Sequence, residues 1–191
     1  FTSVLKRAIR TQWLILDAMD LEQLMDLKVD TVYGASLYTQ TTSEAPSSVT
    51  IITAEQIKRF GWRTLAEILA AVRSFYLTDD RVYTYLGVRG LQRPGDYNSR
   101  VLVLLDGHTT NDNLYGGASF GHDAIVDVAL IDKVEIIRGP GSSLYGTGAF
   151  FGVVNILTRT GKDIGAAEAQ AGAGSLETYE GRLSFGRRFA N

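Results

Sequence analysis

The chain has 191 residues, a formal net charge of −2 at pH 7 and no cysteine. This length suits one domain with or without appendages. A charge so near zero gives no support for nucleic-acid binding, and the lack of cysteine excludes disulfides and thiolate metal sites within this sequence. No apolar run approaches the roughly 20 residues of a transmembrane helix.

Residues 1–29 form an N-terminal extension to which we assign no function. Lys6, Arg7 and Arg10 precede an apolar run at residues 13–16, which is shorter than the ~7–15 apolar residues of a secretory signal. Apolar residues recur at helical spacing over residues 20–27, so a short helix is predicted there. A β-forming stretch at residues 30–35 follows, and then a Thr/Ser-rich, linker-like segment up to residue 47.

Residues 48–160 have the signals of a compact domain. Residues 49–52 are predicted as a strand, and Thr53 with Gln56 forms a capping box for a helix that ends at Gly61. Thr64 opens a second helix with an apolar stripe. Short strands are predicted at 75–77, 83–88 and 100–105, the last so apolar that we expect burial on both of its faces. An Asp–Gly turn at 106–107 ends it.

A long loop over residues 109–122 follows, and loops of this length are usually functional or disordered. A brief helical turn is predicted from Asp123, and then a strand that ends near Arg138. Five glycines separate this strand from a second apolar run at 153–157. The glycine-rich bend fails the P-loop pattern because Thr147 replaces the lysine, and it fails the dinucleotide pattern because Leu144 replaces the last glycine. A soluble α/β domain that binds a ligand or nucleotide through residues 139–148 is the alternative reading.

Four segments resemble the plug domain of TonB-dependent outer-membrane receptors. They are SVTIITAEQI at 48–57, LGVRG at 86–90, VLVLLDG at 101–107, and RGP, SLYG, GA and GVVNI between 138 and 156. The resemblance runs in order from about residue 30 to residue 160. It implies an α+β fold with a small mixed sheet of four to five strands and short flanking helices. It also implies transport rather than catalysis, with no cofactor.

In that family the plug is a gate inside an outer-membrane barrel that takes up a scarce nutrient, such as a siderophore–iron complex, haem or cobalamin. The resemblance therefore places the full receptor in the outer membrane of a Gram-negative bacterium, although we expect this fragment itself to be soluble. A short extended segment, the TonB box, pairs by β-augmentation with the periplasmic protein TonB. The matching residues here are Asp30, Thr31, Val32, Tyr33, Gly34 and Ala35; a plain linker strand is the alternative.

The resemblance also implies two sets of contacts. Arg89 and Arg138, each followed by glycine, would bind barrel glutamates, because a guanidinium group can donate two parallel hydrogen bonds to one carboxylate. Glu135 belongs to the same group, or else pairs with Arg138 inside the plug. The loops at 91–98 and 111–122 would form outward tips that touch cargo, unless they are only solvated loops. Their candidate residues are Arg93, Tyr97, Asn98, Asn113, Tyr115 and Phe120.

Residues 161–191 alternate apolar and polar side chains with period two, which is typical of outer-membrane barrel strands. We expect them to be the first strands of a truncated barrel, forming a C-terminal barrel-type β-hairpin; an ordinary edge hairpin is the alternative. His108 and His122 have no metal-ligand spacing, so no metal site is expected. The sequence has neither a paired-carboxylate site nor a nucleophile elbow, so no enzyme activity is expected.

Overall fold

The computed structural model describes residues 31–32, 40–41, 48–92, 95–146, 148–175 and 177–187. The predictions for residues 1–30, for Tyr33, Gly34 and Ala35, and for Arg93 lie outside this range. The chain divides into two units, residues 1–31 and 32–191. The short strands β1 (Thr31–Val32) and β2 (Gln40–Thr41) pair with each other. No helix in these described segments is long and apolar enough to cross a membrane.

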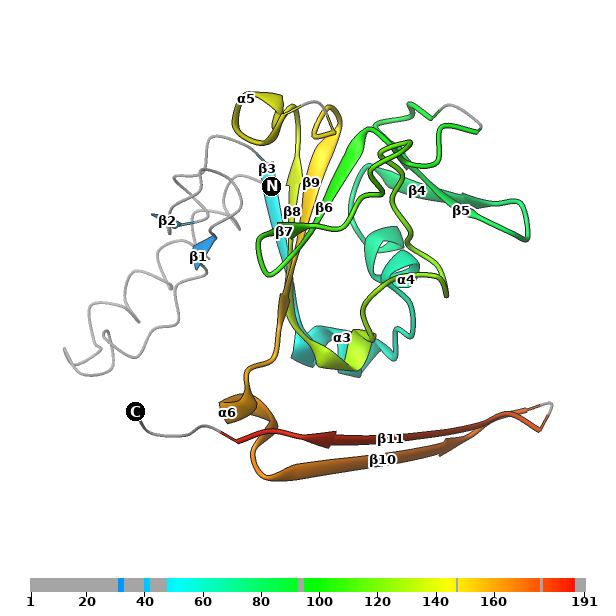
Figure 1. Ribbon diagram of the computed structural model, residues 1–191. Helices are drawn as coiled ribbons and strands as arrows, with labels where there is room; N and C mark the ends of the chain where they lie inside the picture. Colours follow the sequence, from blue (N-terminus) through cyan, green and yellow to red (C-terminus); the bar gives the residue numbers. More distant parts are fainter. Residues whose placement is uncertain are drawn as a thin grey trace, which may run out of the picture. The chain divides into compact units, whose positions relative to one another are not determined.

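A mixed five-stranded sheet with the order β3-β8-β9-β6-β7 is the centre of the fold (Figure 1). Its strands are β3 (Ser48–Thr53), β6 (Val101–Leu105), β7 (His108–Thr109), β8 (Ile131–Arg138) and β9 (Gly152–Thr158). The β6–β9 pair is parallel, whereas β3–β8, β8–β9 and β6–β7 are antiparallel. The predicted α+β class and the mixed sheet of four to five strands are therefore confirmed.

The two main helices begin and end where their capping residues predict. Thr53 and Gln56 form the full capping box of α3 (Ala54–Phe60), and Gly61 ends the helix in the left-handed conformation, with φ 69°. Glycine reaches this conformation without steric cost. Thr64 caps α4 (Leu65–Ala70), but the Glu67 carboxylate accepts a bond from the Arg63 amide, one residue earlier than a capping box requires.

The sheet has an apolar cluster on each face, and β6 supplies both. Val101 and Val103 belong to the larger cluster, which also contains Ile68 and Leu69 of α4. Leu102 and Leu104 point the other way and pack with Ile137, Val153 and Ala149. Alternate residues of a strand face opposite sides, so the uninterrupted apolar run of β6 follows directly from burial on both faces.

Two hairpins accompany the sheet. One pairs β4 (Phe75–Asp79) with β5 (Thr84–Val88). The other pairs β10 (Ala167–Ala173) with β11 (Tyr179–Phe185) and follows the four-residue helix α6 (Gly161–Ile164). In Figure 1, β4 and β5 lie on the same side of the sheet as α4. The strands predicted from the alternating C-terminal residues are thus present as a hairpin.

Two local predictions need correction. The helical turn expected at Asp123 instead forms at η1 (Val128–Leu130), where the Asp127 carboxylate accepts a hydrogen bond from the Ala129 amide at 2.9 Å. Both aspartates can cap a helix, and the sequence alone does not separate them. The bend between β8 and β9 is also more than a turn, because it contains the short helix α5 (Ser142–Tyr145).

Candidate functional site

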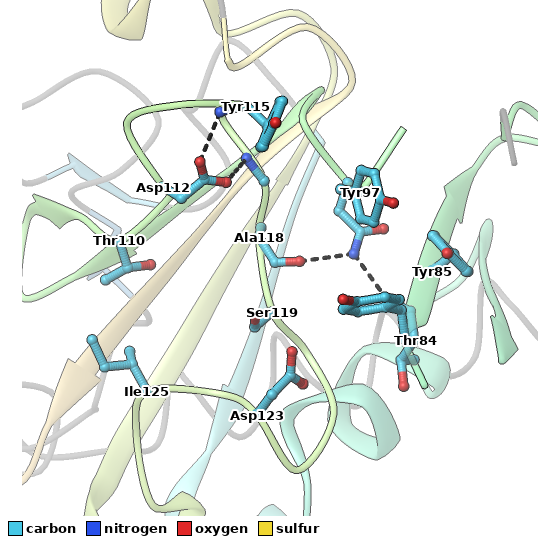
Figure 2. Close-up of a pocket in the computed structure, with 13 residues that line it drawn as sticks. Thr84, Tyr85, Tyr97, Thr110, Asp112, Tyr115, Ala118, Ser119, Asp123 and Ile125 are labelled. Atoms are coloured by element: carbon cyan, nitrogen blue, oxygen red, sulfur yellow. Dashed lines mark hydrogen bonds between the residues drawn. The ribbon is translucent and has the colours of Figure 1, made fainter. Parts of the chain in front are cut away.

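A cavity of about 700 Å³ lies between the start of β5 and the loops that precede β6 and follow β7. Its aromatic lining comes from Tyr83, Tyr85, Tyr97 and Tyr115, and its acidic lining comes from Asp112 and Asp123. Figure 2 labels Tyr85, Tyr97, Tyr115, Asp112 and Asp123 around the cavity. The site therefore combines ring faces, hydroxyl groups and two carboxylates.

Asn98 joins three segments of the cavity wall. Its side chain is only 6% exposed. The Oδ1 atom accepts a hydrogen bond from the Leu86 amide at 2.8 Å, and the Nδ2 atom donates to the carbonyls of Thr84 at 2.9 Å and Ala118 at 2.8 Å (Figure 2). Buried backbone groups need such partners, so Asn98 holds β5, its own loop and the 110–125 loop in one arrangement.

The Asp112 carboxylate organises the loop that carries Tyr115. It accepts hydrogen bonds from the amides of Leu114, Tyr115 and Gly117 at 2.9, 2.7 and 2.6 Å. These bonds, that of Tyr115 first, lower the pKa of the Asp112 carboxyl below its usual value, against the opposing effect of desolvation. The loop is thereby closed into a tight turn, and the Tyr115 side chain stands 72% exposed at its surface.

Three tyrosines form an aromatic group at the opposite wall. Tyr83 and Tyr97 meet edge-to-face with ring centroids 5.4 Å apart, and Tyr85 lies 6.5 Å from each. The Tyr85 hydroxyl donates a hydrogen bond to Asp80 at 2.9 Å. This bond is the main reason why the pKa of Tyr85 rises to about 12. The Asp80 carboxylate also accepts bonds from the Tyr83 and Val82 amides, which lower its own pKa.

The structure brings some of the predicted cargo-loop residues together and separates others. Tyr97, Asn98 and Tyr115 line the cavity, whereas Asn113 is exposed outside it. Phe120 is a correction, because it is fully buried in the core and its carbonyl accepts a hydrogen bond from the Ala66 amide of α4 at 2.7 Å. The loop folds back onto the helix there, which makes Phe120 a packing residue. Asn98 acts by positioning, since its polar atoms are already bonded.

Two of the predicted barrel-contact residues, Arg89 and Arg138, lie together at the end of β8. Arg138 donates from Nη1 to the Arg73 carbonyl at 3.0 Å and from Nη2 to the Ser48 hydroxyl at 2.7 Å. Its Nε atom is buried without a hydrogen bond. Arg89 has a positive φ of 55° and donates to the Arg138 carbonyl at 3.3 Å. Neither guanidinium has a carboxylate within 4 Å among the described residues.

Glu135 is not the partner of Arg138. Its carboxylate is fully buried, with Oε1 3.0 Å from the Lys133 ammonium and Oε2 accepting a hydrogen bond from Asn155 at 3.3 Å. Lys133 and Glu135 are two residues apart on β8, so their side chains are on the same face of the strand. The carboxylate therefore contacts Lys133 and Asn155 instead of Arg138. Such burial also removes Glu135 from the surface at which a barrel contact was expected.

Sequence reasoning missed Asp112, Asp123, Tyr83 and Tyr85 as members of the site. The turn at 112–117 has one sequence signal: Asp112 is followed by Asn113 and, after Tyr115, by two glycines, and these residue types favour turns. His108 lies in β7 and His122 in the following loop, and the part of the chain that the structure describes contains no group of three or more His, Cys, Asp or Glu that could hold a metal ion.

Comparison with known proteins identifies the class of this fold. The TonB-dependent Receptor Plug Domain family matches residues 41–153. The chain is 32% identical over 164 residues to the vitamin B12 transporter BtuB of Vibrio vulnificus, covering 84% of this chain and 25% of that protein. It is 28% identical over 165 residues to the iron-regulated outer membrane virulence protein of Vibrio cholerae, covering 84% of this chain and 24% of that protein.

Solved structures agree on the fold. A structure of FpvA from Pseudomonas aeruginosa bound to heterologous pyoverdines superposes with a TM-score of 0.63 at 21% identity, over 80% of this chain and 19% of that one. The alcaligin receptor FauA from Bordetella pertussis gives 0.58 at 24% identity, over 80% of this chain and 25% of that one. The chain belongs to the TonB-dependent receptor plug domain family, as its motifs predicted. It spans about a quarter of the length of the curated relatives it matches.

Proposed function

We propose that this chain is the gate of an outer-membrane receptor that takes up a scarce nutrient into a Gram-negative bacterium. The family match over residues 41–153 carries this proposal. The bend at 139–148 gives no support to the nucleotide-binding alternative, since Thr147 stands in place of the P-loop lysine. The helix inside the bend, α5, has only four residues.

The proposal also assigns each segment of the chain to a part of the receptor. Residues 1–29 are an extension, residues 30–47 are the TonB box with its linker, residues 48–160 are the plug, and residues 161–191 begin the barrel. The register of β10 and β11 supports the last assignment. Tyr179, Leu183 and Phe185 pair with alanines on one face and are 73–80% exposed. The other face holds the bonds of Arg182 to Glu168 and Gln170.

TonB would capture the segment from Asp30 to Ala35 by adding it as a strand to its own sheet. In this mode the main chain supplies the affinity, so the segment needs an extended backbone more than particular side chains. Thr31 and Val32 have that backbone in β1. Force applied there would then reach the plug through the linker and β3.

Barrel contacts of Arg89 and Arg138 remain a proposal of the same kind. Arg138 has a permanent charge, a buried Nε atom without a hydrogen bond, and no carboxylate within 4 Å among the described residues. The residue is half-buried, and a charge that is partly removed from water without an opposite charge beside it is unfavourable. A glutamate on the barrel wall would compensate it, which fits the interaction that the family resemblance implies.

Cargo would touch the cavity that Tyr97 and Tyr115 line. BtuB of Vibrio vulnificus is a vitamin B12 transporter, and FpvA is solved in complex with iron-loaded pyoverdine; both ligands are bulky metal-containing organic molecules. A cavity of about 700 Å³ can receive one edge of such a molecule, and the barrel loops of a full receptor would enclose the rest.

Capture by the C-terminal domain of TonB tests the proposal. The chain should be retained by the immobilised domain, and Thr31→Pro with Val32→Pro should abolish retention, because proline removes the amide donors that β-augmentation uses. Thr42→Pro, in the linker, is the matched control and should leave capture intact. Retention of the double variant at the wild-type level would contradict the TonB-box assignment. Micromolar binding of ATP or NAD in calorimetry would favour the nucleotide-binding alternative.

A further inference from the structure

We propose that the cavity selects cargo by charge, receiving an uncharged or cationic organic ligand rich in N–H and O–H donors and disfavouring polyanionic chelates. This inference rests on the proposed function, since it takes the cavity as the surface that meets cargo. It adds the chemical class of that cargo. Four observations on the described lining support it.

The formal charges of the lining are all negative. Asp112 and Asp123 are its two ionisable acids, and the described lining residues include no lysine or arginine. The nearby Arg100 is directed elsewhere: its guanidinium lies 3.6 Å from Asp96 and 5.7 Å from the ring centroid of Phe151. An anionic ligand in the cavity would therefore meet repulsion without a compensating cation.

The backbone amides of the 112–117 turn are already engaged. Successive amides in a tight turn commonly form an anion-binding nest, and the 112–117 turn has this form. Its inward amides, those of Leu114, Tyr115 and Gly117, donate to the Asp112 carboxylate. The protein thus supplies its own anion there, and a ligand anion would have to displace a covalently tethered one.

Asp123 presents an open acceptor to the cavity. Asp123 is one of the residues that line the cavity (Figure 2), and its side chain makes no hydrogen bond or ion pair within the described segments. Gly121 leaves room for this carboxylate, because a Cβ there would lie 2.9 Å from Thr84 Oγ1 and 3.2 Å from Asp123 Oδ1. A ligand amide or ammonium could donate to this carboxylate in a charge-assisted bond.

The tyrosines of the lining also favour a cationic or uncharged organic ligand. Ring faces attract cations and stack on planar organic groups, and Tyr83, Tyr85, Tyr97 and Tyr115 all contribute to the wall. The Tyr85 hydroxyl proton is committed to Asp80, so it is not free to bind an anionic oxygen. The remaining hydroxyls of the lining can donate as well as accept, so the two carboxylates and the ring faces carry the preference for a cationic or donor-rich ligand.

Calorimetry on the 191-residue chain at low ionic strength tests the inference with two probes. Cyanocobalamin is uncharged and carries primary amides, whereas ferric enterobactin is a polyanion. The wild-type chain should bind cyanocobalamin at least about tenfold more tightly. Asp123→Lys should raise the affinity for ferric enterobactin about tenfold and Asp123→Asn about threefold, with the effect of Lys shrinking in salt. Asp132→Lys, an exposed change in β8 outside the cavity, should leave both affinities within about twofold.

Three results would overturn the inference: tighter binding of ferric enterobactin by the wild type, an unchanged preference in Asp123→Lys, or binding of neither probe at about 1 mM. Circular dichroism of each variant shows whether the fold is intact, and Asp123→Asn, which keeps the shape of the side chain, still reports if Asp123→Lys is unstable. TonB capture is measured separately on the same chain. If TonB retains the chain but the chain binds the polyanion more tightly, the proposed function stands and only the proposed charge selectivity is wrong.

Discussion

Asn98 shows how one side chain can hold the wall of a site together. Its backbone is in the left-handed region, with φ 62°, and its amide group satisfies one backbone donor and two backbone acceptors from distant segments. A polar group that loses its partner inside a protein costs about 1–3 kcal/mol. The cavity wall therefore depends on a residue that was predicted as a cargo contact.

We expect Asn98→Ala to lower the free energy of unfolding by about 3 kcal/mol, because three buried backbone groups lose their partner and alanine disfavours a positive φ. Asn98→Gly keeps that backbone conformation accessible and should recover no more than about 1 kcal/mol. Urea denaturation followed by circular dichroism gives both values. Asn113→Ala, an exposed asparagine in the neighbouring 110–125 loop, is the control. A loss below about 1 kcal/mol in Asn98→Ala would show that the three bonds do not hold the wall.

At the scale of the element, local sequence was sufficient wherever local chemistry decides the structure. Thr53 and Gly61 mark the ends of α3, and the unbroken apolar run of β6 predicted burial on both faces. Phe120 could not be placed in this way, because its burial depends on a loop that returns to α4 from more than 50 residues further along the chain. Likewise the Glu135–Lys133 pair follows from strand alternation in three dimensions rather than from the Arg138 motif beside it.

The β10–β11 hairpin has two chemically different faces, and this difference is directly measurable. If these are barrel strands, the face with Leu183 meets lipid and the face with Ser184 does not. We expect Leu183→Trp to shift tryptophan emission to shorter wavelength when detergent micelles are added. Ser184→Trp, one residue away on the polar face, should show a much smaller shift. The unchanged chain, with its two native tryptophans, provides the baseline to subtract.

Equal shifts for the two variants would indicate a hairpin with no preferred face toward the apolar phase, as in an ordinary edge hairpin. The comparison is sensitive because adjacent residues of a strand differ in direction but hardly in position. It therefore tests the assignment of residues 161–191 without requiring the rest of a barrel.

At the scale of the whole molecule, the order of strands determines how a pull on the N-terminal segment enters the plug. β3 is an edge strand that follows the linker directly, and it is hydrogen-bonded only to β8 within the five-stranded sheet. Its first residue, Ser48, lies opposite Arg138 and accepts that residue's Nη2 bond. Tension from the proposed TonB box would reach this contact before any other part of the sheet, so β3 should separate from β8 while the remaining strands stay paired.

An engineered disulfide between β3 and β8 tests this order of events in optical tweezers. Val49 and Ile137 are directly opposite in antiparallel strands, where Cα atoms lie about 4.5–5.5 Å apart, within disulfide range. The chain has no native cysteine to interfere. With handles at both termini, the wild type should show an early low-force event, which oxidised Val49→Cys with Ile137→Cys should lose and reduction should restore. Asp79→Cys with Thr84→Cys closes the β4–β5 hairpin instead and should keep the event. An early event that survives the first disulfide would place the initial opening elsewhere, since a covalent link between β3 and β8 prevents their separation.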